Sequence, residues 1–553
     1  MTFTVADLIA EFLDRMDIET AFGIVSVHNI PMLDAISRRN RMRVVTPRGE
    51  AGAAHMADGY ARATGKLGLL ITSTGPGAAN AVGGLVEAQF ASTPVLHLTG
   101  QTLTKFVDRG MGTIHDIPDQ LGLMRAAGKA SFRIRNAQDA LGVLRQAVAA
   151  AWSHPRGPVT VEVPLDIQRE AIERPQALDT VGLPHLRPPE PSEAEMAALT
   201  DLLLSARRPM LWLGRGASQA GDAARALLDM GLGMVTSIAG RGVVSEDHPM
   251  SLGPLTGSGL PMVEAFYETV DLMIVAGGRV RGHETVDFSV SLPKRLVRID
   301  INPRADGRTY PNIGFVLGDA AEVLGGLAER VRGRLSIDPA FAGELAALKT
   351  QARAALAATM GPYASFADQL RAVTPNDAIW ARDITINNST WGNKLFKLDD
   401  PSANIYPIGA GIGQGFPLGI GAALSPGRRK TVVMTGDGGF YLSLAELWTA
   451  IQENLDMTIL VMNDQGYGVI RHIQDKAVGG RRRFDRISGP DLEGLAKLAG
   501  MPYWRVSAPH EFGPKAQEAI AVRGLALVEV DMTAIGDHPP YYPYGPKAEV
   551  VKV

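Results

Sequence analysis

Two aspartates set among glycines are the residues of this sequence that most clearly point to chemistry. In the stretch "MTGDGGFYLSLAELWTAIQENLDMTILVMNDQGYG", residues 434–468, Asp437 lies between glycines and Asp464 stands near the end. Two carboxylates that meet suit a hard, oxygen-preferring cation such as Mg²⁺, which in turn suits a diphosphate. Glycines let the backbone approach closely, and amides at a helix start can face anionic oxygens. A Gly-Asp-Gly turn is also common without a metal. Whether this one binds a metal therefore depends on the secondary-structure elements around it.

Those elements are expected to bring the two aspartates together. Residues 431–435 are apolar and β-branched, residues 443–454 have apolar positions at helical spacing behind a serine cap, and residues 457–462 form a second apolar run. A strand–helix–strand crossover joins parallel strands and places their carboxyl ends at one edge of the sheet. Asp437 and Asp464 each follow such a strand. We therefore expect them to converge in a crevice, where open α/β sheets bind ligands.

The stretch resembles the signature of the thiamine-diphosphate-dependent enzyme family, a Gly-Asp-Gly turn followed at a distance by an Asn-Asn pair. Here the second asparagine is replaced by Asp464, which adds one negative charge to the site. The resemblance implies that Mg²⁺ is held by the side chains of Asp437 and Asp464 and by the main-chain carbonyl of Gly466. It also implies that the cofactor-binding residues of this stretch include Gly436, Gly438, Gly439, Tyr467 and Gly468.

A glutamate opens a second candidate segment, "RVVTPRGEAGAAHMADGYARATGK", residues 43–66. From chemistry alone, Glu50 at the start of a small-residue helix favours the helix dipole. Family members carry such a glutamate before a helix ending Asp-Gly-Tyr-Ala-Arg, matched here by residues 58–62, and "TSTGPGAAN", residues 72–80, matches the next turn. The resemblance implies that Glu50 hydrogen-bonds the aminopyrimidine ring, whose imino nitrogen then removes the thiazolium proton to give the nucleophilic ylide. A carboxyl group with a raised pKa meets that requirement.

Two further segments match parts of the family that contact the cofactor. "PIGAGIGQGFPLGIGAAL", residues 407–424, matches the segment that meets the aminopyrimidine. By resemblance Ile412 pushes the cofactor into its bent shape, and a carbonyl near Ala410 accepts a hydrogen bond from the 4′-amino group. Without the family, Ile412 would be interpreted as ordinary core. "DITINNSTW", residues 383–391, looks like the loop at the diphosphate end, with the candidates Asn387 and Asn388.

Two histidines are candidates for proton relay. His28 stands where the benzaldehyde lyase type also has histidine, and His115 where acetohydroxyacid synthases and benzaldehyde lyase carry glutamine. Ser73 replaces the catalytic histidine of the benzoylformate decarboxylase type. A histidine relay therefore uses His28 or His115, and the alternative for each is a solvated loop histidine.

Substrate selection is expected on loops near these histidines. With Ser26 in addition, the predicted pocket is more polar than an aromatic cleft, which favours a small 2-oxo acid such as pyruvate. Val469, Ile470 and His472 follow the metal loop and are candidates for the acyl pocket. The tail "GDHPPYYPYGPK", residues 536–547, is expected either to form a lid with its tyrosines or to pack on the surface.

Composition excludes several classes of protein. Hydrophobic residues make up 46% and charged residues 20% of the chain, with 61 glycines, which is typical of a soluble α/β protein. A net charge of −3 without a basic stripe gives no case for nucleic acid. The chain has no cysteine, which excludes disulfides, cysteine-bound zinc and thiol catalysis. The acidic start has no signal architecture and no run is long and apolar enough for a membrane span, so we expect a cytoplasmic protein.

The chain of 553 residues is too long for one core. We expect three doubly wound, parallel-sheet α/β domains: a pyrimidine-binding domain at 1–170, a central domain at 192–335, and a diphosphate- and Mg-binding domain with the carboxyl-terminal tail at 361–553. A proline-rich linker covers 175–191, and an alanine-rich helical connector covers 337–360.

The central domain raises the question of FAD. The segment "LWLGRGAS", residues 211–218, is followed by Gln219 where a Gly-x-Gly-x-x-Gly motif would have glycine. "GGRVRGHET", residues 277–285, departs from the segment of flavin-binding acetohydroxyacid synthases, although Asp300 ends a strand where an adenine ribose is sometimes held. The sequence favours an empty central domain over one that binds FAD.

The resemblance implies a thiamine-diphosphate-dependent decarboxylase and carboligase acting on 2-oxo acids, of the acetolactate synthase type. The alternatives are a lyase of the benzoylformate decarboxylase or benzaldehyde lyase type on aromatic substrates, a flavin-dependent oxidase of the same family, and a non-catalytic cofactor-binding protein. Expected partners are a 2-oxo acid or acyloin and other copies of the chain. In the family the Glu50 domain of one subunit meets the Asp437 domain of another, which implies a homodimer or homotetramer with shared active sites.

Overall fold

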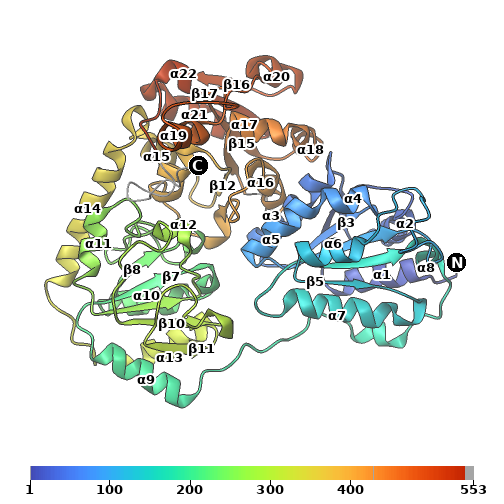
Figure 1. Cartoon of the computed structure of the whole chain (residues 1–553), viewed down its shortest axis with the longest axis horizontal. Coiled ribbons are helices and arrows are strands. Elements are labelled where there is room, and N and C mark those ends of the chain that lie inside the picture. Colours follow the sequence, from blue (N-terminus) through green and yellow to red (C-terminus); the bar gives the residue numbers. More distant parts are fainter. Residues whose placement is uncertain (1, 428, 542–553) are drawn as a thin grey trace.

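The structure, a computed structural model, describes residues 2–427 and 429–541 (Figure 1). Within these residues the strands form parallel sheets of six, five and six strands, each in a layered α/β unit. The prediction of three parallel-sheet α/β domains is confirmed, while the residue limits given for them remain predictions. None of the helices in the described ranges combines the length and hydropathy of a transmembrane span.

The first unit is built on a sheet with the strand order β2-β1-β3-β4-β6-β5. Its strands β3, β4 and β6 are buried along their whole length, as expected for parallel strands covered by helices on both faces. The strands are β1 Thr20–Gly23, β2 Arg43–Val45, β3 Gly68–Thr72, β4 Val95–Gln101, β5 Ala130–Arg133 and β6 Val159–Pro164. The helices are α1 Val5–Arg15, α2 Ile30–Arg39, α3 Glu50–Thr64, α4 Pro76–Asn80, α5 Val82–Ala91, α6 Gln120–Ala127, α7 Ala140–Trp152 and α8 Leu165–Arg169.

The central unit follows an extended segment that runs along the bottom of Figure 1. Its sheet has the order β11-β10-β9-β7-β8. The strands are β7 Pro209–Leu213, β8 Gly233–Thr236, β9 Leu272–Ala276, β10 Leu296–Asp300 and β11 Gly314–Leu317. The helices are α9 Glu193–Leu204, α10 Gly221–Asp229, α11 Pro261–Tyr267, α12 Gly282–Thr285 and α13 Ala320–Val331. Helix α14, Phe341–Ala358, lies within the predicted connector and leads to the third unit.

The third unit has the strand order β13-β12-β14-β15-β17-β16. The strands are β12 Ile379–Arg382, β13 Asn404–Ile405, β14 Thr431–Gly436, β15 Met457–Asn463, β16 Tyr503–Val506 and β17 Leu525–Asp531. The helices are α15 Phe366–Val373, α16 Gly415–Ala423, α17 Asp437–Leu442, α18 Leu447–Gln452, α19 Gly468–Ala477, α20 Leu492–Leu498, α21 Phe512–Ala521 and α22 Met532–Ile535. The single helix expected over 443–454 is instead a 3₁₀ turn at Leu444–Glu446 followed by α18, and α17 precedes that range.

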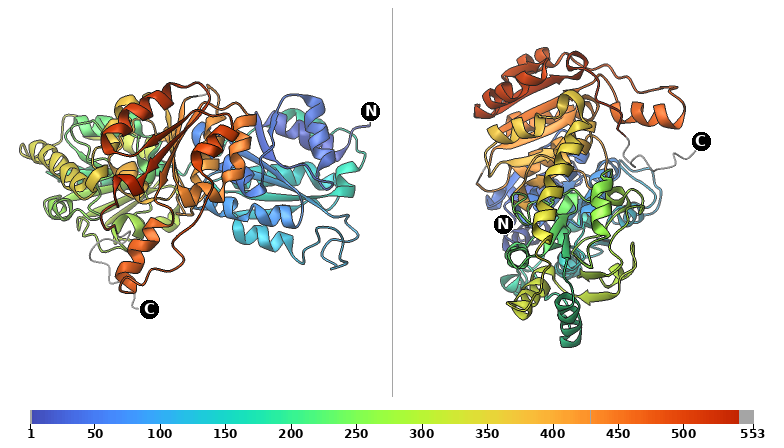
Figure 2. Two further views of the ribbon diagram at one scale, coloured as in Figure 1. Left: turned by 90° about the horizontal axis from the view of Figure 1, so that it is seen from above. Right: turned by 90° about the vertical axis from the view of Figure 1, so that its left-hand side faces the viewer.

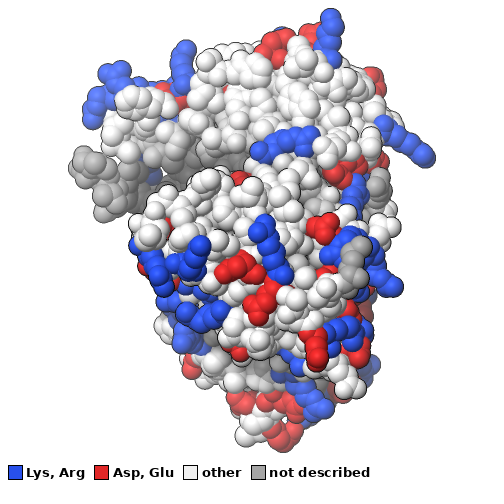
Figure 3. Space-filling view, turned by 90° about the vertical axis from the view of Figure 1, so that its right-hand side faces the viewer, with Lys and Arg blue, Asp and Glu red and all other residues white. Residues whose placement is uncertain are grey.

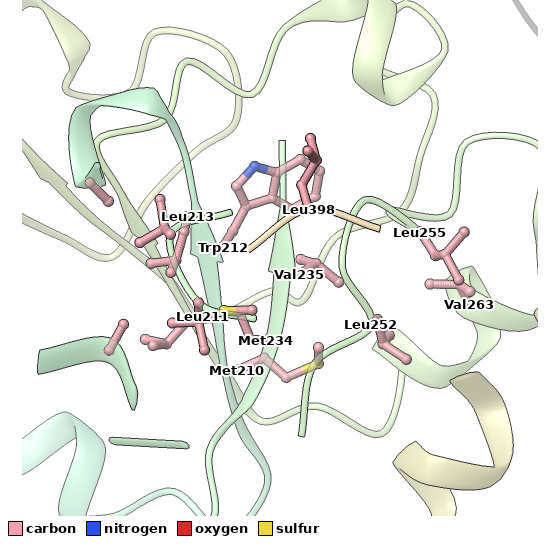
Figure 4. Packing of buried hydrophobic residues seen from close by; sticks show 14 of the residues in the cluster. Met210, Leu211, Trp212, Leu213, Met234, Val235, Leu252, Leu255, Val263 and Leu398 are labelled. Carbon is pink, nitrogen blue, oxygen red and sulfur yellow. The ribbon is translucent and has the colours of Figure 1, made fainter. Parts of the chain in front are cut away.

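The third unit packs against both of the others (Figures 1 and 2). Helices α3 and α16 cross closely, since a Cβ on Gly59 would lie 2.0 Å from the Leu418 carbonyl oxygen and one on Gly421 would lie 2.0 Å from that of Met56. Toward the central unit the apolar core is continuous, and Leu398 lies beside Trp212 of β7 (Figure 4).

The surface carries both signs of charge in a mixed pattern. On the face seen from the side of the first unit, Lys and Arg are interspersed with Asp and Glu (Figure 3). Such a face has no single-sign field of the kind that steers a polyanion.

Candidate active site

Asp437 and Asp464 lie at the carboxyl ends of neighbouring strands of the third sheet. Strands β14 and β15 pair with Gly436 opposite Met462, so both aspartates leave the sheet at one edge. The Asp437 carboxylate accepts a hydrogen bond from the Gly466 N–H at 2.9 Å, and the two carboxyl groups are close enough to hydrogen-bond each other. The structure therefore brings together the three residues predicted to hold Mg²⁺.

The carboxylates of Asp437 and Asp464 would be stabilised by a nearby positive charge. Burial raises the pKa of Asp437, and burial together with the charge of Asp437 raises the pKa of Asp464. Asp437 is 1% exposed, and its Oδ1 has no hydrogen-bond partner in the described part of the chain. Arg471 offsets part of the charge, because its guanidinium lies 3.5 Å from Asp464 Oδ2 and donates to the Asp464 carbonyl at 3.0 Å. A cation would satisfy the remaining negative charge.

A cation at this site would need main-chain ligands as well as the two aspartates. The described residues contain no group of three or more His, Cys, Asp or Glu side chains fit to hold a metal. Two carboxylates and the Gly466 carbonyl form a set of hard oxygen ligands of the type that Mg²⁺ accepts, completed by substrate or water oxygens.

The glycines of the Gly-Asp-Gly turn allow a close approach that no other residue permits. Asp437 is the first residue of α17, so the turn leads directly into a helix. A Cβ on Gly438 would lie 2.7 Å from the ring of Tyr467, and one on Gly439 would lie 2.4 Å from Asp383 Oδ2. Gly468, which begins α19, lies against the Asp464 carboxylate in the same way. The predicted cofactor-binding residues of this stretch are therefore assembled around the aspartate pair.

Asp383 is a residue of this edge that the sequence analysis did not single out. It is buried directly after β12, and its Oδ2 accepts a hydrogen bond from the Gly413 N–H at 2.8 Å. Burial raises its pKa to about 6. The bond ties the loop that carries Ala410 and Ile412 to the Gly439 turn. The signal was available, because an aspartate that immediately follows a strand is the pattern that identified Asp437.

The loop itself presents the two residues predicted from the family resemblance. Ala410 has a left-handed backbone, with φ of +64°, and is exposed. Ile412 is 41% exposed, which is unusual for an isoleucine in an otherwise buried segment. The structure thus leaves this side chain uncovered beside the aspartate edge instead of placing it in the core.

Asn387 and Asn388 are buried at the start of a π-helical turn, Asn388–Gly392. The Asn387 Oδ1 accepts a hydrogen bond from the Trp391 indole at 2.8 Å, and the Asn388 Oδ1 accepts one from Arg382 at 3.1 Å. These bonds hold both side chains within the protein. The Asn388 Nδ2 is buried without a hydrogen-bond partner in the described part of the chain.

A second group of candidates lies at the corresponding edge of the first sheet. Glu50 begins α3, is half-buried, and accepts a hydrogen bond from the Asn80 amide at 3.2 Å. A Cβ on Gly77 would lie 3.0 Å from the Glu50 Oε1 and 2.8 Å from the Cβ of Ser73. Ser73 Oγ is 3.3 Å from His115 Nδ1. The structure therefore joins Glu50 to the histidine pair through one turn.

The two histidines lie side by side, with ring centroids 5.2 Å apart. His28 is 7% exposed and its Nδ1 has no partner in the described ranges. Burial, and secondarily the neighbouring His115, lowers the pKa of His28, so its ring is neutral near pH 7. A buried neutral imidazole with a free nitrogen can take up or release a proton at a fixed position. A solvated loop histidine could also exchange protons, but its ring would not be held in place.

The acyl-pocket candidate His472 is covered by the chain that follows β17. Its Nδ1 accepts a hydrogen bond from the Tyr541 N–H at 3.0 Å, and the Tyr363 hydroxyl donates to the Gly536 carbonyl at 2.6 Å. Residues 536–541 thus cross the edge of the third unit. The other two tail tyrosines of the predicted lid lie outside the described residues.

Within the described chain the two groups remain separate. No hydrogen bond or ion pair of these residues joins Glu50, His28 or His115 to the aspartate edge of the third sheet. Each edge holds one half of the predicted chemistry.

Comparison with known proteins gives the same division of the chain. Models of the thiamine pyrophosphate enzymes match at residues 3–123 (N-terminal TPP binding domain), 196–327 (central domain) and 386–530 (C-terminal TPP binding domain). A probable 2-ketoarginine decarboxylase of Pseudomonas aeruginosa is 30% identical over 85% of this chain and 84% of its own length. The acetolactate synthase isozyme 3 large subunit of Escherichia coli is 27% identical over 97% and 96%, and a probable acetolactate synthase large subunit of Methanocaldococcus jannaschii is 28% identical over 95% and 91%.

Proposed function

Since this chain belongs to the thiamine pyrophosphate enzyme family, with all three of its domains, we propose that it decarboxylates a small 2-oxo acid such as pyruvate and ligates the product to a second carbonyl compound. The observation that carries the proposal is the buried pair Asp437 and Asp464 beside Gly466, in a chain similar to acetolactate synthases over nearly its whole length. Thiamine diphosphate, when bound, supplies a carbon nucleophile that adds to the 2-oxo group and accepts the electrons released as CO₂ leaves.

The diphosphate end would be held by the third unit. Asp437, Asp464 and the Gly466 carbonyl would bind Mg²⁺. Its positive charge would offset the repulsion between the two acids and give the Asp437 Oδ1, which has no hydrogen-bond partner among the described residues, a ligand to bind. The first amides of the turn at Gly438 and Gly439 would face the phosphate oxygens, since anions are stabilised at a helix start. Ile412, uncovered beside this edge, would support the cofactor ring.

Proton transfer would be the task of the first unit. Glu50 would exchange a proton with the aminopyrimidine ring and so control the activation of the cofactor. The neutral His28, in contact with His115, would hold or supply the proton of the substrate oxygen. Ser73 would orient His115 through the 3.3 Å contact to its Nδ1.

The two halves would meet between two copies of the chain. Several apolar side chains near the histidine pair are exposed in the single chain, and Ile114 next to His115 is 73% exposed. The others are Val25, Val27, Ile30 and Met111. Exposed apolar patches of this kind mark surfaces that another protein covers. We expect the second copy to cover them and to bring its own Asp437 edge opposite Glu50, in a homodimer or a pair of dimers.

The central unit would hold no flavin. The turns after β7 and β9, where a dinucleotide would lie, pack on one another: Gly216 N–H donates to the Gly277 carbonyl at 2.9 Å, and a Cβ on Gly214 would lie 2.3 Å from that oxygen. These glycines therefore serve turn-to-turn packing. Purified protein should be colourless, and an absorbance band near about 450 nm that survives gel filtration would instead indicate the flavin oxidase.

A substrate panel tests the proposal. Protein loaded with thiamine diphosphate and Mg²⁺ is incubated with pyruvate, 2-oxobutyrate, 2-ketoarginine, phenylglyoxylate or benzoin, and CO₂, aldehyde and acyloin are measured. CO₂ and acetolactate from pyruvate are expected. Turnover confined to phenylglyoxylate or benzoin would favour the aromatic lyase type, and tight cofactor binding without any turnover would favour a non-catalytic protein.

A further inference from the structure

A pocket lies at the seam between the central and third units, beside the proposed active site. The central unit contributes the segment around Thr256 and Ser258 and the start of α12, and the third unit contributes the chain around the π-helical turn. Its polar and charged lining residues are Thr256, Ser258, His283, Glu284, Ser389, Asn393, Lys394 and Tyr541. We call it the seam pocket. Its empty volume, counting the open mouth, is about 420 Å³.

Lys394 gives the seam pocket its charge. The ammonium makes one hydrogen bond, to the Ser258 carbonyl at 3.3 Å, and forms no salt bridge with any residue in the described ranges. An ammonium has three donors, so most of its bonding capacity is unused. Lys397, three residues later, differs in this respect, because it forms an ion pair with Asp247.

Glu284, the one acid among the described lining residues, does not neutralise Lys394. Glu284 is buried and bound to Arg281, whose Nη2 lies 3.2 Å from Glu284 Oε1. Arg281 also donates to the Ile408 carbonyl at 2.7 Å. The charges of Glu284 and Arg281 cancel each other, so the positive charge of Lys394 is left uncompensated by this pair. The other polar lining groups include donors: Ser389 and Thr256 hydroxyls and the ring of His283.

The seam pocket borders the proposed active site. Ser389 follows directly on Asn388, and the Tyr541 side chain interacts with Ser389. The Tyr541 N–H binds His472 of α19, the helix that begins beside Asp464. A substrate whose reactive end lay at the aspartate edge could therefore extend a distal group toward the seam pocket.

We propose that the seam pocket binds an anionic oxygen group, a carboxylate or a phosphate, through the ammonium of Lys394 with the Ser389 hydroxyl as a second donor. Burial lowers the pKa of Lys394 to about 8, so the charged form lacks stabilisation that an anion would supply. Two sources share this chemistry: the distal carboxylate of a 2-oxo diacid substrate, or a separate phosphate compound. The first source rests on the proposed function, and the second does not. A guanidinium on the substrate would be repelled.

Binding is tested first, without reference to turnover. Full-length wild-type protein, Lys394→Met and the control Lys397→Met are titrated with inorganic phosphate and with 2-oxoglutarate by calorimetry and thermal shift. The expected result is that at least one anion binds wild type and Lys397→Met, with affinity lowered about tenfold or more in Lys394→Met, the scale of a lost charge-assisted bond. Lys394→Arg should retain binding. Equal affinity in wild type and Lys394→Met, or no binding of either anion, would overturn the proposal.

Kinetics then separate the two sources. If the anion belongs to the substrate, the ratio of kcat/KM for 2-oxoglutarate to that for pyruvate should fall about tenfold or more in Lys394→Met and remain unchanged in Lys397→Met. If it is a separate ligand, phosphate should alter pyruvate kinetics in wild type but not in Lys394→Met. Lys394-dependent phosphate binding in a protein that turns over no 2-oxo acid would keep the seam pocket and refute only the proposed function.

Discussion

The first and third units have the same strand order, yet the residues at the carboxyl edges of their sheets differ in kind. Each strand of the third sheet has a counterpart at the same place in the first, and α3 and α16, which follow β2 and β13, pack against each other. The first edge carries Glu50, His28 and His115, to which we assign proton exchange. The third carries the carboxylate pair Asp437 and Asp464, which suits a cation. The shared fold supplies only the edge, and the residues after each strand decide its chemistry.

The largest expected effect is the loss of the cation at the third edge. Asp437→Ala should lower turnover by at least about a thousandfold, because the diphosphate would lose both its metal and its anchor. The variant should also lose the rise in melting temperature that Mg²⁺ and thiamine diphosphate give to wild type. Asp475→Ala, on the surface of α19 and paired with Arg482, is the control and should keep both. An Asp437→Ala protein stabilised by the cofactor as strongly as wild type would show that the cation binds elsewhere.

Chelation should reproduce this effect reversibly. Prolonged dialysis against EDTA should abolish activity, and Mg²⁺ should restore it, since two carboxylates with one arginine cannot hold a diphosphate unaided. Full activity in metal-free protein, checked by elemental analysis, would refute the metal role of the pair.

At the first edge, Glu50→Gln should lower turnover by about a hundredfold to ten-thousandfold, the size of a general acid–base contribution. Because Glu50 is not in contact with the aspartate edge of its own chain, the Mg²⁺ dependence of the melting temperature should be retained. Glu19→Gln, which removes a surface partner of Lys66, is the matched control. Unchanged activity in Glu50→Gln would remove Glu50 from its role.

The histidine pair should give a smaller effect with a distinct pH dependence. His28→Ala should lower carboligation or cleavage by about a hundredfold. Because burial lowers the pKa of His28, wild-type activity should fall on the acid side only below about pH 6.5. The free energy of unfolding should also fall below about pH 6.5. The unfolded state binds a proton on this histidine at a higher pH than the folded state does, so acid favours unfolding. The variant should lack this acid limb, and a loss below about threefold would transfer the relay to His115.

Substitutions at the contact between α3 and α16 should have the smallest effect on activity. They should instead change the free energy of unfolding. Gly59→Ala places a Cβ 2.0 Å from the Leu418 carbonyl oxygen and should lower the free energy of unfolding by about 3 kcal/mol. Gly142→Ala in α7 meets no atom within 4 Å and should raise it by about 0.5–1 kcal/mol. Urea unfolding measures both, and equal changes in the two variants would contradict the close helix contact.

The sequence predicted most where a strand leads directly to a reactive residue. Parallel-strand geometry alone placed Asp437 beside Asp464, and the fold class followed from alternating apolar runs and helical patterns. The contact between His28 and His115 could not be predicted from spacing, because loops of unknown path join them. Lys394 had no local signal either, since its lack of a charged partner among the described residues depends on how two units pack. The family resemblance, not periodicity, singled out Ile412, whose exposure is visible only in the structure.

The central claim is that one active site takes its proton-transfer half from one subunit and its cation half from another. It is tested by mixing the two inactive variants Glu50→Gln and Asp437→Ala through co-expression with different affinity tags and assaying the purified mixed dimer. A mixed dimer has one site with Glu50 and Asp437 both intact and one with neither, so it should show about half of the wild-type activity, while each parent shows almost none. A mixed dimer as inactive as its parents would mean that both residues act within one chain, and would contradict the account.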